Sequence, residues 1–125
     1  MSCKRIKTHL LDIHFFSVYS SFISTLTIMA ERVLELVATR HITIFSKADS
    51  PETIPAVSLL EETFGFSPFI LYLDQDPEGT EIEHYLMHST RQQSLPNIFI
   101  KKHHIGDFNS LMMLHQTGQL KSAMA

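Results

Sequence analysis

The stretch IFSKADSPETIPAVSLLEE, residues 44–62, decides the fold of this chain. It predicts an apolar strand that ends at Lys47, then a short polar turn and a helix. Ser50 and Pro51 favour a helix start, because serine is a good N-cap residue and proline is tolerated at the first helical position. Pro55 lacks an N–H and disturbs the first full turn, so a later start of the helix is an alternative.

Apolar periodicity on both sides of this stretch predicts the other elements. We expect helices at about 30–40, within 74–90 and at 108–117, strands at 42–46, 69–74 and 95–100, and a hairpin or edge strand in 101–106. The core face of the middle helix is expected to hold Ile82, Tyr85, Leu86 and Ser89. The order α-β-α-β-α-β-β-α predicts an α/β domain in which helices cover both faces of a small mixed four-stranded sheet.

Glycine and aspartate residues give the expected helix ends. Gly65 and Gly118 are natural C-terminal stops, and Asp107 is a candidate N-cap for the last helix. Pro96 falls at the first position of the third strand, where a missing N–H is tolerated. These residues place turns between the periodic segments, and no linker divides the chain.

Length and composition indicate one globular domain. The chain has 125 residues, of which 44% are apolar and 18% charged. A net charge of −3, with a single basic pair at Lys101-Lys102, argues against nucleic acid as a partner. Cys3 is the only cysteine, which excludes an internal disulfide, a CxxC redox pair and a cysteine-based zinc site.

Residues 1–28 form a basic and apolar extension before the expected domain at 29–125. Lys4, Arg5 and Lys7 precede a run without Asp, Glu, Lys or Arg from Ile13 to Ala30, as in a secretory signal or a signal anchor. The many serines and threonines in that run make it a poor membrane span.

The alternatives for this extension are a non-functional upstream segment and an extra structured element. A clean helix is expected to begin at Met29-Ala30-Glu31, so Met29 is an alternative start. The chain would be cytoplasmic if Met29 is the functional start. It would enter the secretory pathway, with membrane anchoring as an option, if 1–28 is a signal or anchor.

Histidine spacing raises a metal hypothesis. Glu81, His84 and His88 lie within one stripe of a helix, which is an acceptable ligand geometry. An exposed helix face is the simpler interpretation, because no cysteine or second motif accompanies them. We therefore expect no metal ion and no iron–sulfur cluster.

Four blocks carry a family resemblance over essentially all of residues 30–120. They are ITIFSK (42–47), ILYLDQDPEGTEIEHYL (70–86), SLPNIFIKKHHIG (94–106) and LMMLHQTGQL (111–120). In this order the blocks resemble the glutaredoxin family of the thioredoxin-fold superfamily. The segment FSPFILYLD (66–74) and the N-terminal extension look most like the fungal secretory-pathway branch.

This resemblance implies glutathione binding and glutathione-dependent disulfide exchange. In that family a cysteine at a helix N-terminus is the nucleophile, and a cis-proline and a glycine turn hold the glutathione peptide. The glutathione-binding positions carried over to this chain are Lys47, Ser50, Leu95, Pro96, Gly106, Phe108 and Asn109.

The same resemblance exposes departures from the family pattern. Ser50 and Thr53 occupy the two CxxC positions, and a serine hydroxyl has no accessible anion near neutral pH without a positioned base. The other departures are Glu52 for an aromatic residue, Asp107 for the second turn glycine, Asn109 for an aspartate, and Gln92 and Gln93 where basic residues often lie. We therefore expect thiol–disulfide oxidoreductase activity to be lost.

Three interpretations of the function remain. The first is a pseudoenzyme that binds glutathione or a protein partner in the groove between the 47–53 turn, Leu95-Pro96 and the 106–109 turn. The second is a glutathione-dependent transferase or lyase, in which Ser50 stabilises the thiolate of bound glutathione. The third is a sequence under no functional selection.

Overall fold

The computed structural model describes the backbone of residues 13–125 and the side chains from Thr25 onward. The basic start of the predicted signal or anchor, Lys4, Arg5 and Lys7, lies outside the described residues, as does Cys3. Within the described part, no helix combines the length and the apolar character that crossing a membrane requires.

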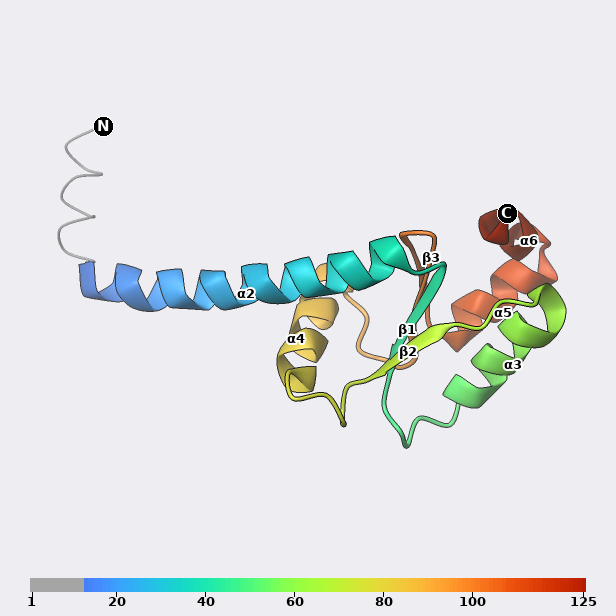
Figure 1. Cartoon of the computed structure of the whole chain (residues 1–125), viewed down its shortest axis with the longest axis horizontal. Coiled ribbons are helices and arrows are strands. Elements are labelled where there is room, and N and C mark those ends of the chain that lie inside the picture. The colour runs from blue at the N-terminus through green and yellow to red at the C-terminus, as the bar shows by residue number, and fades with distance from the viewer. Residues whose placement is uncertain (1–12) are drawn as a thin grey trace.

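The described chain alternates helices and strands, as predicted (Figure 1). The elements are α2 (Ile13–Thr39), β1 (Ile42–Ser46), α3 (Thr53–Phe64), β2 (Phe69–Tyr72), α4 (Gly79–Thr90), β3 (Asn97–Ile100), β4 (His103–Gly106), α5 (Phe108–Gln116) and α6 (Gln119–Met124). The order repeats the predicted α-β-α-β-α-β-β-α and adds the short helix α6 after Gly118, which the sequence pattern did not reveal.

The four strands form one mixed sheet in the order β2-β1-β3-β4. The central strand β1 pairs in parallel with β2 and antiparallel with β3, and β3 pairs antiparallel with β4. Lys101 and Lys102 make the tight β3–β4 turn, with φ angles of 48° and 74°. The predicted small mixed sheet is thus confirmed.

Helices cover both faces of this sheet, and each face has its own apolar cluster. On one face α3, α5 and α6 enclose a cluster formed by Ile42, Ile44, Ala56, Leu60, Ile98, Ile100, Leu111, Leu120 and Met124. On the other face α2 and α4 enclose Met29, Val33, Val37, Phe45, Leu73, Ile82 and Leu86. Alternating side chains of β1 and β3 therefore pack into two core layers, one on each face of the sheet.

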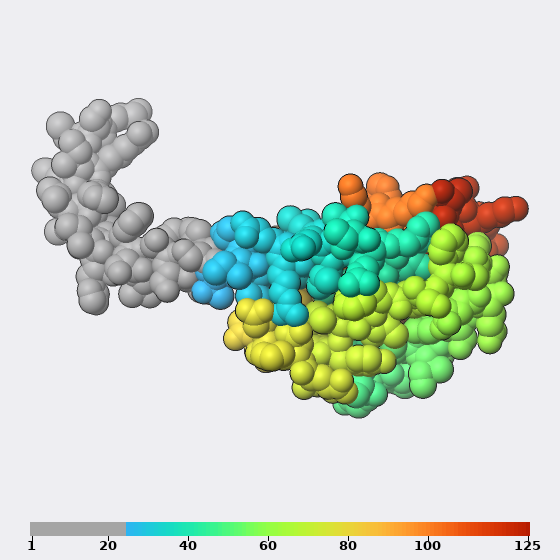
Figure 2. Space-filling model, viewed as in Figure 1, coloured from blue at the N-terminus to red at the C-terminus, as the bar shows by residue number. Residues whose placement is uncertain are grey.

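Helix α2 differs most from the prediction, which placed its start near Met29. It runs without interruption from Ile13, since residues 13–39 contain neither glycine nor proline to stop it. Its C-terminal part lies along α4 (Figure 2), whereas its N-terminal part continues past α4 (Figure 1). The boundary at Met29 is therefore not a helix start.

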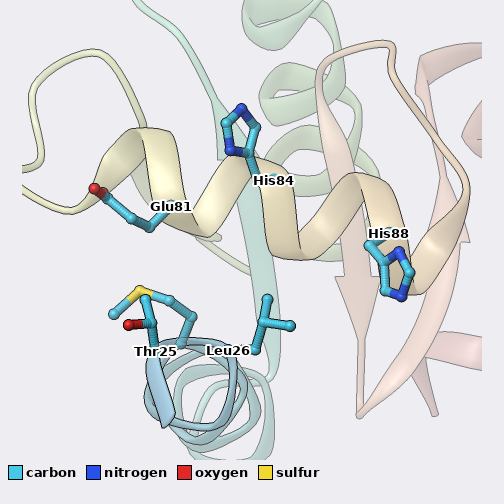
Figure 3. A pocket seen from close by; sticks show the side chains of 6 residues that line it. Thr25, Leu26, Glu81, His84 and His88 are labelled. Carbon is cyan, nitrogen blue, oxygen red and sulfur yellow. The ribbon is translucent and has the colours of Figure 1, made fainter. Parts of the chain in front are cut away.

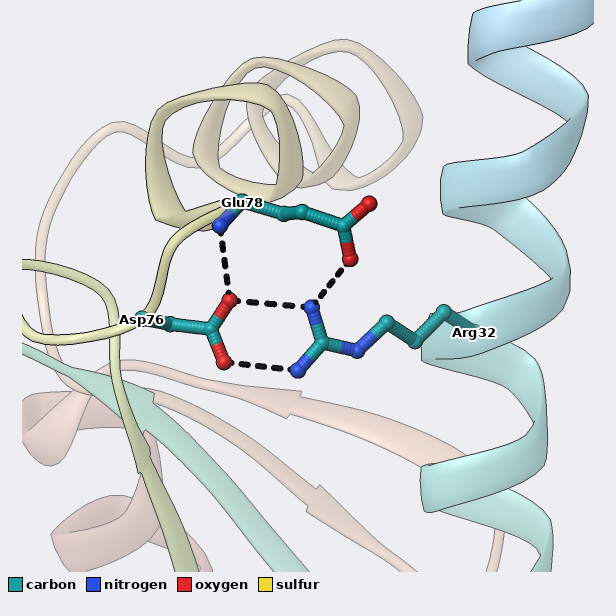
Figure 4. Close-up of polar contacts among 3 residues, drawn as sticks. All are labelled: Arg32, Asp76 and Glu78. Atoms are coloured by element: carbon teal, nitrogen blue, oxygen red, sulfur yellow. Dashed lines mark hydrogen bonds and ion pairs between the residues drawn. The ribbon is translucent and has the colours of Figure 1, made fainter.

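A charged cluster fixes α2 to the loop before α4 (Figure 4). The Arg32 guanidinium donates to both carboxylate oxygens of Asp76, at 2.9 and 2.6 Å, and to Glu78 Oε1 at 2.7 Å. The Glu78 backbone N–H also donates to Asp76 Oδ1. These bonds to Arg32 lower the pKa of Asp76 and raise that of Arg32, so the bidentate pair is ionised over the ordinary pH range.

Two other expectations for the helices need correction. Ser50 is not the N-cap of α3: the helix begins at Thr53 with Glu52 in the cap position, and its first turn closes through the Ala56 N–H to the Glu52 carbonyl. Pro55 explains this late start, because it has no N–H to close an earlier turn. In α4, Ser89 is exposed rather than part of the core face.

The predicted ends at Gly65 and Asp107 are confirmed. Gly65 closes α3 in the left-handed conformation, with its N–H bonded to the Glu61 carbonyl. Asp107 caps α5 by accepting the Ser110 N–H at 2.9 Å.

Candidate functional site

The β1–α3 turn is held by the end of the neighbouring strand. The Ala48 N–H reaches both carboxylate oxygens of Asp74 at 3.2 Å, and the Ser50 N–H closes the turn on the Lys47 carbonyl at 3.0 Å. Asp74 follows β2, the parallel partner of β1, so both strands end at this edge of the sheet. The turn is therefore positioned by sheet topology together with one carboxylate.

Ser50 faces the loop that precedes β3. Its hydroxyl donates to the Leu95 carbonyl, with an Oγ–O distance of 3.4 Å, and Ser50 is half-buried. The Leu95-Pro96 peptide bond is cis, as the resemblance implied, and Pro96 is buried. Residues 45 positions apart in the sequence are thus brought into contact.

Thr53 is buried and paired inside the domain. Its hydroxyl lies 2.5 Å from the Ser46 hydroxyl, and both side chains are buried. The pair satisfies two polar groups that the end of β1 and the start of α3 would otherwise leave unpaired in the core. The second CxxC position therefore holds a structural hydrogen bond.

Lys47 forms an ion pair with α4. Its Nζ lies 3.0 Å from Glu83 Oε2, and each side chain is about one-third exposed. This contact connects the β1–α3 turn to the helix on the α2 side of the sheet. A carboxylate ligand at Lys47 would have to compete with Glu83.

Gln92 and the β4–α5 turn hold the cis-proline loop in place. The Gln92 amide donates to the carbonyls of Ser94 and Pro96, at 2.9 and 3.1 Å. Gly106 has a φ of 118°, and a Cβ there would lie 2.8 Å from Ser110 Oγ, so this position needs glycine. Asp107 accepts the Ser94 hydroxyl at 3.4 Å and so joins the turn to the cis-proline loop.

Comparison with known proteins assigns the family. No protein-family model matches the chain. Glutaredoxin-1 of Rhizophagus irregularis is 37% identical to it over 95 residues, which span 76% of this chain and 93% of that protein. Glutaredoxin of Ricinus communis is 35% identical over 86 residues, which span 69% of this chain and 83% of that protein.

The chain belongs to the glutaredoxin family.

Solved structures agree with this assignment and with a thioredoxin-like fold. The buckwheat glutaredoxin–glutathione complex matches with a TM-score of 0.73 at 29% identity, covering 81% of this chain and 91% of that one. Wheat glutaredoxin matches with a TM-score of 0.69 at 31% identity, covering 80% and 90%. The fold predicted from the four sequence blocks is confirmed.

Within this glutaredoxin fold, the carried-over positions divide into two groups. In the first group, Ser50 contacts the Leu95 carbonyl beside the cis Pro96, Lys47 lies in the same turn as Ser50, and Gly106 lies in the β4–α5 turn. The remaining two positions begin α5: Phe108 is half-buried and packs against the α3–α5 core cluster, and Asn109 is exposed. Their binding of glutathione stays a prediction.

Three aspartates lie near these positions of the glutaredoxin domain. Asp49 is exposed in the β1–α3 turn, Asp74 is exposed and bonded to that turn, and Asp107 contacts Ser94 of the cis-proline loop. The hydrogen bond from the Ser110 backbone N–H lowers the pKa of Asp107, so that carboxylate is charged at neutral pH. Of these groups only Lys47 is cationic, and it is paired with Glu83.

Sequence reasoning missed four residues that shape this site. The β1–α3 turn is held by Asp74, and Lys47 is held by Glu83. The cis-proline loop is held by Gln92 and Ser94. Gln92 was noted only as the replacement of a basic residue. The polar residues just after a strand end were the available indication for Asp74.

The histidine stripe of α4 does not make a metal centre with its surroundings. Among the residues with described side chains, no group of three His, Cys, Asp or Glu residues is close enough together to hold a metal ion. Glu81, His84 and His88 instead line a cavity between α4 and α2 (Figure 3).

Proposed function

We propose that this chain is a glutaredoxin-family protein without thiol–disulfide exchange activity, which acts as a binding module through the groove between Ser50 and Leu95-Pro96. Its ligand is glutathione, held weakly, or a segment of a protein partner. The contact that carries the proposal is the hydrogen bond from Ser50 to the Leu95 carbonyl. A hydroxyl takes the place of the nucleophile while the groove around it is assembled.

Two observations support the loss of exchange chemistry. Within the part of the chain that the structure describes, the Ser50 hydroxyl pairs with the Leu95 carbonyl and with no histidine or other base, so it has no route there to a nucleophilic anion near neutral pH. Thr53 at the second position also lacks a thiol, and its buried hydroxyl is paired with Ser46. Neither residue can form the mixed disulfide on which exchange depends.

The charges around the groove support weak binding of glutathione. The free peptide carries two carboxylates and one ammonium near neutral pH, a net charge of −1. Asp49, Asp74 and Asp107 disfavour such a ligand, and Lys47 is already paired with Glu83. A partner segment with amino or guanidinium groups would suit the same surround better.

The test is a glutathione titration of the full chain followed by amide NMR shifts, together with a disulfide-reduction assay. The Cys3→Ser background removes the only thiol of the chain. We expect background activity, and weak saturable shifts at Lys47, Leu95 and Asn109 if the peptide site is retained. Ser50→Cys in the same background is the matched comparison, because it returns a thiol to the groove.

Each outcome has a defined meaning. Disulfide-exchange activity in the Cys3→Ser protein would refute the proposed loss of thiol–disulfide exchange. Absence of shifts at the highest glutathione concentration used would exclude the peptide as ligand and leave a protein partner. Turnover of a chloronitrobenzene with glutathione, abolished by Ser50→Ala, would establish the transferase interpretation instead.

A further inference from the structure

A second cavity lies beside the edge strand β4, on the face of the sheet that α2 and α4 cover. It has a volume of about 240 Å³, and side chains of α2, α4, β3 and the β3–β4 hairpin line it. Neither Ser50 nor Leu95 is among the lining residues. The cavity is therefore separate from the contact on which the proposed function depends.

The apolar part of the lining is continuous with the core. It consists of Val33, Leu34, Val37, Leu86 and Phe99. Val33, Val37 and Leu86 are at most 5% exposed, whereas Leu34 is 60% exposed although it is apolar. Apolar cavities of about 150 Å³ already admit a benzene ring. This cavity has room for one ring and a polar substituent.

The polar part of the lining carries a cation and no carboxylate. It consists of Tyr85, Ser89, Thr90, Lys102 and His104, so no aspartate or glutamate is among the described residues that line the cavity. The ion pairs of the described residues do not include Lys102. The adjacent Lys101 instead donates to the Ala125 carbonyl. Lys102 thus offers an unpaired ammonium beside apolar surface.

A chain of hydrogen bonds fixes the tautomer of His104. The Thr90 hydroxyl donates to the Leu86 carbonyl at 2.7 Å, so the Thr90 oxygen accepts from Asn97 Nδ2 at 3.2 Å. This bond orients the Asn97 amide with Oδ1 toward the imidazole, and His104 Nε2–H donates to it at 2.8 Å. A further proton can be added only at Nδ1, and it makes His104 a second cation of the lining.

We propose that this cavity binds a small carboxylate with a compact apolar body, of the size of a one-ring aromatic acid. The apolar body lies against Val37, Leu86 and Phe99, and the carboxylate pairs with Lys102. An ammonium and a protonatable imidazole beside an apolar wall complement an acid of this kind. An amine of the same size would meet no opposite charge among the lining residues.

Binding of the carboxylate is coupled to protonation of His104. Partial desolvation of the ring lowers the pKa of His104, so the imidazole is neutral near neutral pH in the free protein. Tyr85 and Lys102 are the other titratable groups of the lining, and of these three residue types only histidine ordinarily titrates between pH 5 and 8. A nearby carboxylate favours the imidazolium, so affinity rises as the pH falls.

An amide NMR titration of the full chain with benzoate, acetate and benzyl alcohol tests the proposal without any substitution. We expect benzoate to bind at least about tenfold more tightly than the other two, with shifts at Leu86, Phe99 and Lys102. Equal affinity for benzyl alcohol would overturn the role of the charge, and equal affinity for acetate that of the apolar wall. Absence of saturable shifts at the highest benzoate concentration used, or shifts centred on Ser50 and Leu95, would overturn the site.

Lys102→Gln and Lys101→Gln are matched variants, because both positions lie in the same turn and both have positive φ angles. The Lys102 variant is expected to bind benzoate about tenfold more weakly, and the Lys101 variant to bind it like the parent. Equal affinities of the two variants would overturn the pairing with Lys102.

The pH dependence tests His104 separately. Between pH 8 and about pH 5.5, where benzoate stays ionised, the affinity of the parent should rise roughly threefold or more. His104→Gln keeps an N–H donor for Asn97 but does not titrate, so its affinity should stay level. A level profile in the parent, or the same rise in the variant, would refute the coupling. Because Ser50 and Leu95 are untouched, failure here leaves the proposed function standing.

Discussion

Gly79 provides the sharpest test of the packing, because two effects of replacing it have opposite signs. It is the first residue of α4 and is buried. An alanine Cβ at this position would lie 1.6 Å from the Leu73 carbonyl oxygen and 2.6 Å from the Leu73 carbonyl carbon. Helix propensity alone predicts that Gly79→Ala gains up to about 1 kcal/mol, whereas the contact predicts a loss.

The contact is expected to decide the outcome. Real Cβ contacts are essentially never shorter than 3.0 Å, so α4 or the end of β2 has to move by more than 1 Å. The clashing atom belongs to the backbone, and no change of rotamer relieves it. Overpacking of a core costs about 1–3 kcal/mol, and a forced backbone shift belongs at the upper end. After the propensity gain, we expect Gly79→Ala to lower the free energy of unfolding by about 2 kcal/mol.

Urea denaturation, with the slope of the transition checked for two-state behaviour, measures this change. Gly65→Ala is the matched control: nothing lies within 4 Å of its Cβ position, but its φ of 74° is unfavourable for alanine. That control should lose about 1–2 kcal/mol from backbone strain alone. A Gly79→Ala protein as stable as the parent, or more stable, would refute the steric reasoning.

Three further substitutions test other contacts by the same denaturation assay. Arg32→Ala is expected to lower the free energy of unfolding by about 1–3 kcal/mol. Most of that loss should disappear when Asp76 is already Asn. Additive losses would show that the two residues are not coupled. Because the folded-state pKa values of Asp76 and Asp107 are lowered, the stability that these two carboxylates contribute should be constant above about pH 5 and fall as the pH drops below their unfolded value near 3.9. Asp107→Asn, which still caps a helix, should weaken that acid dependence, and an unchanged profile would contradict the assignment. Ser46→Ala should lower the free energy of unfolding by about 1–3 kcal/mol, because it leaves the Thr53 hydroxyl buried and unpaired. Adding Thr53→Val should recover part of this loss. A further loss of stability would argue against the paired hydroxyls.

Most of the fold could be predicted because it depends on local patterns. The strand at 42–46 was predicted with its observed bounds, and the stops at Gly65 and Asp107 follow from turn and cap chemistry. The errors occurred where two local rules conflict. Ser50 looks like an N-cap, but Pro55 removes the N–H that an earlier first turn would need.

The site was less predictable, because its contacts join distant segments. The family pattern indicated that Ser50, Leu95 and Pro96 belong together, and the structure places the Ser50 hydroxyl on the Leu95 carbonyl beside the cis Pro96. It gave no indication that Glu83 would pair with Lys47. That contact depends on how α4 is seated against the sheet, which no spacing within a single helix encodes.

Lys47 can pair either with Glu83 of α4 or with a carboxylate ligand, and this competition couples ligand binding to α4. Any carboxylate that binds Lys47 takes the ammonium from Glu83, so the binding free energy measured in the groove contains the cost of breaking an internal pair. Added salt screens the internal pair and the ligand contact together. Anion affinity should therefore respond to ionic strength less steeply than it would at a free lysine, and changes in α4 can tune it without touching the groove.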